Sequence, residues 1–176
     1  MTRLTRLARG AVIALALALV IAAPAAAAQP TRTIFRWTNL VEHFPAGMGC
    51  TFDVTVQLMP GAQVTVTDFS DGREVVEEHS MHRTITSDVT GKSFVENQEF
   101  RDAEWIDPTS GLRLGESSGQ FIDTFAPGDV GPYGVVDQTV SYAVIGSQTY
   151  VLDPNTYATL AVTIKGTITN ICASIS

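Results

Sequence analysis

The chain is poor in cysteine, histidine and basic residues. Its 176 residues include two cysteines, three histidines and eleven lysines and arginines, against eighteen aspartates and glutamates, for a formal net charge of −7. Nucleic acid and anionic membranes require a basic patch on the protein that binds them. The acidic balance therefore argues against both as partners.

Several motifs that carry chemistry are also missing. No Asn-x-Ser/Thr glycosylation acceptor is present. The stretch Thr90-Gly91-Lys92-Ser93 resembles the end of a phosphate-binding loop but has Thr86 where that loop needs its first glycine. We expect a turn between strands there, and no cofactor.

Long apolar runs are absent except within residues 1–28. This segment has a basic start, an apolar run of roughly a dozen residues, too short for a membrane span, and a small-residue end. It predicts a signal peptide cleaved between Ala28 and Gln29, and hence a secreted, extracellular protein without a stable membrane anchor. Removing its three arginines leaves eight basic against eighteen acidic residues, a charge of −10.

The two cysteines, Cys50 and Cys172, remain after cleavage. An even count in an exported protein favours a disulfide, and two cysteines allow one intramolecular pairing. A lone pair of cysteines does not indicate a metal centre. The sequence therefore predicts a Cys50–Cys172 bridge.

The sequence pattern after residue 28 predicts mainly β-strands. Residues 50–58 alternate apolar and polar side chains, Pro60-Gly61 follows, and residues 63–67 alternate again, which predicts a hairpin. Residues 158–172 alternate in the same way, with Cys172 on the apolar side. Residues 95–105 are ambiguous between a short helix and an irregular strand. We expect an extended segment over 29–49 with one strand near 33–38, then one β domain over 50–176.

Many short strands separated by turns predict an antiparallel barrel or sandwich. The cysteines are much farther apart than in an immunoglobulin-type sandwich. A meander whose terminal long strands share a disulfide fits a closed barrel better, because closure removes the exposed edges. The prediction is a barrel of about eight to nine strands, with a β-sandwich as the alternative.

Two groups of side chains are candidates for chemistry. His79 and His82 would point to opposite faces of a strand and could share a metal ion only across a bulge. Carboxylates crowd residues 96–107 beside Trp105, and a glycosidase would need two of them facing each other across a sugar. Neither group marks a catalytic or metal site by itself. The weak candidates are His79, His82, Glu96, Glu99, Asp102 and Glu104.

Some motifs point to a known group. They are Gly49-Cys50-Thr51-Phe52-Asp53-Val54, Phe69-Ser70-Asp71-Gly72, Thr90-Gly91-Lys92-Ser93 and the late Cys172. With these motifs the chain resembles a group of small secreted, β-rich proteins of high-GC bacteria. The resemblance implies export and a β-rich domain, and it implies no activity.

Two functions follow from these observations. The first is a non-enzymatic exported β-barrel that binds a small ligand, a cell-envelope component or another protein. The second is a secreted barrel enzyme, a hydrolase or cyclase-like protein, with acidic residues in a pocket. The second predicts that several of the six candidate residues converge within hydrogen-bond reach of one another.

Overall fold

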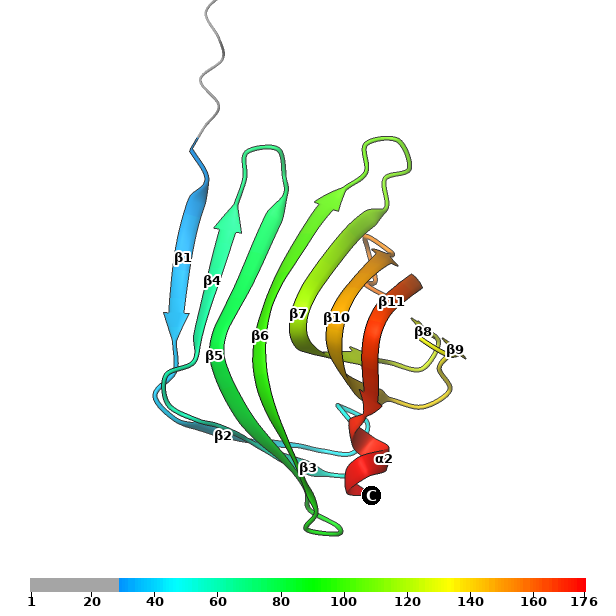
Figure 1. The fold of residues 1–176 in the computed structure, drawn as a ribbon. Helices are drawn as coiled ribbons and strands as arrows, with labels where there is room; N and C mark the ends of the chain where they lie inside the picture. The colour runs from blue at the N-terminus through cyan, green and yellow to red at the C-terminus, as the bar shows by residue number, and fades with distance from the viewer. Residues whose placement is uncertain (1–28) are drawn as a thin grey trace, which may run out of the picture.

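The computed structural model describes residues 29–176. The predicted signal peptide over residues 1–28 therefore lies outside the described residues. Within residues 29–176 the fold is all-β apart from one short helix (Figure 1). Its elements are β1 (Thr31–Arg36), β2 (Leu40–Phe44), β3 (Val54–Leu58), β4 (Gln63–Asp68), β5 (Glu74–Ser87), β6 (Ser93–Ile106), β7 (Arg113–Phe125), β8 (Val130–Gly131), β9 (Gly134–Val135), β10 (Val140–Leu152), β11 (Thr159–Asn170) and α2 (Ile171–Ile175).

The strands form one large antiparallel sheet that follows the order of the chain. Its path is β1-β4-β5-β6-β7-β10-β11, and β3 pairs with both β2 and β5. Because β3 and β4 lie end to end along β5, and β2 and β1 lie end to end beside them, each of these pairs acts as one bent strand. Figure 1 shows β5 and β6 curving, with β2 and β3 crossing below.

The predicted hairpin over residues 50–67 is wrong. The strands β3 and β4 each pair with β5 rather than with each other, and Pro60-Gly61 forms a corner between them. The backbone bends there through Gly61, whose φ of +103° favours glycine. The corner between β3 and β4 is hydrogen-bonded to the corner between β1 and β2, because Trp37 N donates to the carbonyl of Ala62.

A second set of bends lies on the other half of the sheet. Gly119, Gly146 and Gly166 are paired across β7, β10 and β11 and all have positive φ. A Cβ on Gly146 would lie 2.1 Å from the carbonyl oxygen of Lys165, so no side chain fits. Three adjacent strands therefore bend together along one row of glycines.

The sheet stays open. Within residues 29–176 no pairing joins β1 or β2 to β11, so the predicted closure into a barrel is not seen. The second sheet, β8-β9, is a two-stranded ribbon, so the alternative of a β-sandwich is not confirmed either. Residues 29–49 form two strands of the large sheet, where one strand in an extended segment was expected. Residues 95–105 belong to the regular strand β6.

The predicted disulfide is confirmed, with Cα atoms of Cys50 and Cys172 5.5 Å apart. Neither cysteine lies on a strand, contrary to expectation. Cys50 precedes β3, and Cys172 lies in α2 because Asn170 ends the strand and caps the helix by accepting from Ala173 N. The bridge packs with buried Val54, Ile85, Ala143, Ile171 and Ile175 into one of two core clusters.

The Thr90-Gly91-Lys92-Ser93 stretch is a turn between β5 and β6, as predicted, and it holds α2. Thr90 Oγ1 donates to the carbonyl of Ile175 over 2.6 Å, and Lys92 Nζ donates to the carbonyl of Ser176 over 2.5 Å. These contacts satisfy carbonyl groups that a helix end leaves without partners. The turn therefore has a structural role.

Candidate functional site

The six candidate residues divide between the two faces of β5 and β6. Side chains alternate along β6, so Glu96, Asp102 and Glu104 share one face and Glu99 lies on the other. Glu96 is buried, whereas the side chain of Glu99 is 74% exposed. The parity of the strand therefore separates Glu99 from the other carboxylates.

The histidines lie on the exposed face together with Glu99. The pairing of β5 with β6 shifts between Glu78 and Met81, and Ser80 there has a φ of +55°. This bulge puts His79 next to Glu99, at 3.5 Å, and His82 next to Asn97, at 2.6 Å. Each histidine contacts a different residue, and in residues 29–176 no group of three or more His, Cys, Asp or Glu could hold a metal ion.

Asp102 and Glu104 converge on a tyrosine from a strand far along the chain. The Tyr150 hydroxyl lies 2.9 Å from both carboxylate oxygens of Asp102 and 2.8 Å from Glu104 Oε1. A hydroxyl has one hydrogen to donate. Because both carboxyl groups contact the same oxygen atom, no sugar can lie between them as a glycosidase would need.

Neighbouring strands hold this pair of carboxyl groups in place. Ser117 Oγ donates to Asp102 Oδ1 over 2.5 Å, and Arg113 Nη1 donates to Glu104 Oε2 over 2.7 Å. The Tyr150 ring lies over Gly115, where a Cβ would come within 2.1 Å of the ring. The missing side chain at Gly115 therefore allows the tyrosine to reach its partners.

The acid–tyrosine cluster lines a cavity of about 280 Å³, which we call the acidic cavity. Its walls include Asp102, Glu104, Ser117, Phe121, Asp123, Asp129, Gln148, Tyr150 and Tyr157. Gln148 Nε2 donates to Asp123 Oδ2 over 2.9 Å. Asp129 is a structural residue, since its two oxygens accept from the backbone of Ala126 and Thr159.

Burial changes the protonation of this cluster. Desolvation raises the pKa of Asp102, and the hydrogen bond from Ser117 only partly opposes it. Desolvation also raises the pKa of Asp123 and, together with the nearby carboxylates, that of Tyr150. Tyr150 therefore stays a neutral donor, and the two aspartates hold their protons to higher pH than exposed ones.

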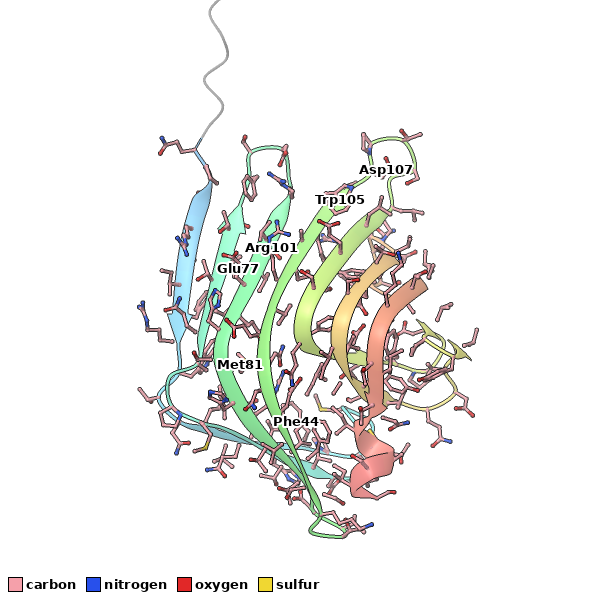
Figure 2. The ribbon with its side chains drawn as sticks, viewed as in Figure 1. Phe44, Glu77, Met81, Arg101, Trp105 and Asp107 are labelled. Carbon is pink, nitrogen blue, oxygen red and sulfur yellow. A yellow bond between two sulfur atoms is a disulfide. The ribbon has the colours of Figure 1, made fainter. Side chains whose placement is uncertain are left out.

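A larger cavity of about 450 Å³ adjoins the acidic cavity at Ile122 and Thr124, and we call it the apolar cavity. Its walls are mainly Trp37, Leu40, Phe44, Met48, Val54, Val56, Leu58, Val64, Met81, Ile85, Ile122 and Ile171. Phe44 and Met81 are labelled in Figure 2. Val54, Val56 and Leu58 all line it, as the alternation of that stretch predicted.

Charged groups are set into the wall of the apolar cavity. Glu78 and Arg83 line it, and Arg83 Nε donates to Glu96 Oε2 over 2.9 Å. Glu78 Oε2 and Glu96 Oε1 are buried without a hydrogen-bond partner. Burial raises the pKa of both carboxyl groups, while Arg83 opposes the shift. Glu78 and Arg83 thus form a polar spot in a mainly apolar wall, which also includes Glu42, Thr124 and Ser141.

Several residues that line these cavities, or contact a lining residue as Arg113 does, were not predicted from the sequence. They are Glu78, Arg83, Arg113, Asp123, Gln148 and Tyr150. The alternation of side chains along a strand could have shown that Glu96, Asp102 and Glu104 share a face that excludes Glu99. No sequence signal paired that strand with Tyr150, which lies 48 residues after Asp102 along the chain.

Over residues 29–176 the chain is an all-β protein with one large, bent antiparallel sheet, on which the two cavities described above are built. None of the helices within residues 29–176 is long and apolar enough to cross a membrane. Comparisons with family models, with curated proteins and with solved structures give no match. The arguments for function therefore rest on the two cavities.

Proposed function

We propose that the protein is an exported, non-enzymatic binding protein whose apolar cavity holds one small, largely apolar molecule. The observation that carries this proposal is the cavity itself. Its volume of about 450 Å³ falls within the range of roughly 300–1,000 Å³ for small-molecule sites. Apolar walls with a few polar groups are typical of such sites.

The polar spot supports a ligand with one hydroxyl-like group. Such a group can donate to the unpartnered Glu78 Oε2 and accept from the guanidinium of Arg83, which both line the cavity. A buried acceptor without a partner costs about 1–3 kcal/mol. A ligand that supplies the missing donor recovers part of this free energy, which favours it over a purely apolar molecule.

Export is part of the proposal. A disulfide persists in an oxidising compartment, so the Cys50–Cys172 bridge supports a location outside the cytoplasm. We interpret the open sheet as a barrel-like wall that leaves one side accessible to ligand. A cell-envelope component or a protein partner would instead contact the outer surface and leave the cavity empty.

The test is a titration of the purified protein with N-phenyl-1-naphthylamine, a neutral apolar fluorescent probe. We expect saturable binding, with a change in the emission of Trp37, which lines the cavity. Val56→Phe fills the cavity and should weaken binding about tenfold or more, the order expected for overpacking that costs above ~1.4 kcal/mol. Val95→Phe is the matched control, because Val95 is 68% exposed on another strand.

Two results would contradict the proposal. One is an absence of saturable binding by the folded protein, and the other is equal binding by Val56→Phe and the wild type. The natural ligand can then be sought by mass spectrometry of organic extracts from protein purified out of its native culture. Recovery of the same small molecule from the wild type and its loss in Val56→Phe would identify it.

A further inference from the structure

The acidic cavity is rich in hydrogen-bond acceptors and short of donors. Tyr150 and Ser117 already donate to carboxyl groups, Gln148 Nε2 donates to Asp123, and Arg113 donates to Glu104. Each of these hydrogen bonds ends on an oxygen atom of the cluster, whereas the Arg113 Nε donor is buried without a partner. A ligand entering here meets mainly acceptors, together with the hydroxyl groups of Tyr157 and Thr159.

One acceptor is left without a partner. Gln148 is 6% exposed and lines the cavity, and its Oε1 is buried with no hydrogen bond. Buried polar atoms in folded proteins nearly always have a partner. The orphaned oxygen indicates that a donor from outside the chain completes this site.

The charge around the cavity is also unbalanced. Four of its wall residues are carboxylic acids, and the one ion pair that residues 29–176 make to them joins Glu104 to Arg113. Carboxylates in a partly buried site are costly unless a positive charge offsets them. A cation would therefore be stabilised here, and an anion would be repelled.

The geometry favours an organic cation over a metal ion. No three carboxyl or imidazole groups in the described part of the chain converge as metal ligands. The acceptors surround a cavity of about 280 Å³ whose walls include Phe121, Tyr150 and Tyr157. Aromatic rings attract ammonium groups through cation–π interactions.

We propose that the acidic cavity binds a small organic cation, a primary ammonium group on a compact apolar or aromatic body. The ammonium group has three hydrogens to donate. Gln148 Oε1 and the carboxylate of Asp123 accept from it, and the aromatic walls enclose the body of the molecule. This site is separate from the apolar cavity, although Ile122 and Thr124 contribute to both.

The experiment is isothermal titration calorimetry at pH 7 with 2-phenylethylammonium and with its neutral analogue 2-phenylethanol. We expect one saturable site for the ammonium probe and at least about tenfold weaker binding of the alcohol, the order of a lost charge-assisted hydrogen bond. Gln148→Leu should weaken ammonium binding by a similar factor. The control Glu99→Gln should leave it unchanged, because Glu99 lies exposed on the opposite face of β6.

Three outcomes would overturn the inference: no saturable ammonium binding, equal affinity for the alcohol, or equal loss in Glu99→Gln and Gln148→Leu. The comparison of the two probes uses the wild-type chain, so it stands even when Gln148→Leu does not fold. Binding of N-phenyl-1-naphthylamine tests the apolar cavity separately. Val56→Phe should keep the ammonium site, and Gln148→Leu should keep the naphthylamine site.

Discussion

Gly115 controls whether Tyr150 can reach its two carboxyl partners. A Cβ built on Gly115 would lie 2.1 Å from Tyr150 Cζ and 2.4 Å from its hydroxyl oxygen. Ordinary carbon contacts begin near 3.4 Å, so Gly115→Ala must push the ring away by at least about 1 Å. Hydroxyl hydrogen bonds span about 2.5–3.0 Å. The contacts of 2.8 Å and 2.9 Å to Glu104 and Asp102 would then be lost.

The cost has three parts. Overpacking costs about 1–3 kcal/mol, and losing a hydrogen bond to a charged group costs about 1.5–3 kcal/mol. Replacing glycine in a strand returns about 0.5–1 kcal/mol of conformational entropy. We expect Gly115→Ala to lower the free energy of unfolding by ~3 kcal/mol, measured by urea denaturation.

A double-mutant cycle tests the stated cause. In a Tyr150→Ala background the clash is gone, so adding Gly115→Ala should be neutral or stabilise by up to about 1 kcal/mol. Gly49→Ala is the matched control, since its Cβ would meet Ser141 Oγ at an ordinary 3.8 Å. Equal costs of Gly115→Ala with and without Tyr150 would refute the reasoning.

Three other perturbations have defined outcomes. Replacing Cys50 and Cys172 by alanine removes a cross-link between residues 122 positions apart. The free energy of unfolding, measured in urea, should fall by about 4–5 kcal/mol. A loss below ~1 kcal/mol would contradict the chain-entropy explanation. Gly146→Ala would place a Cβ 2.1 Å from the Lys165 carbonyl oxygen at a φ of +148°, so we expect a loss of about 3 kcal/mol or more in thermal melts. Because burial raises the pKa of Asp123 above 3.8, the folded state holds its proton longer than the unfolded chain, and stability should fall as pH rises from about 4 toward neutrality. Asp123→Asn should flatten this pH dependence of the melting temperature, and an unchanged slope would argue against it.

The sequence predicted the elements of the fold better than their pairing. Alternation predicted strands over residues 50–58 and 63–67, and the structure forms them over 54–58 and 63–68; the even cysteine count, with the expected export, predicted the disulfide. The predicted pairing of these two strands was wrong because the dipeptide Pro60-Gly61 fits a hairpin turn and a corner equally well. Only contacts with β5, formed far along the chain, distinguish the two.

The candidate site was partly within reach of the sequence. The many carboxylates of residues 96–107 marked this stretch as a candidate site. Because the stretch is a strand, alternation of its side chains places Glu99 on the opposite face from Asp102 and Glu104. Tyr150 and Gln148 carry no local signal, since they alternate on an ordinary strand like many polar residues. Their role depends on which strand neighbours which and on where the sheet bends.

The glycine bend and the acidic cavity are one feature of the fold. The register pairs Gln148 with Ser117 and Tyr142 with Asp123, so Gln148 and Asp123 are offset by six residues along the paired strands. On a straight sheet that offset is about 20 Å at ~3.3 Å per residue. Their side chains nevertheless form a hydrogen bond of 2.9 Å, which requires β7 and β10 to fold sharply between them, at the paired Gly119 and Gly146. The bend brings an amide and a carboxyl group together around a cavity that neither strand could form alone. Any side chain at Gly146 therefore acts on the proposed cation site through the backbone, without touching a ligand.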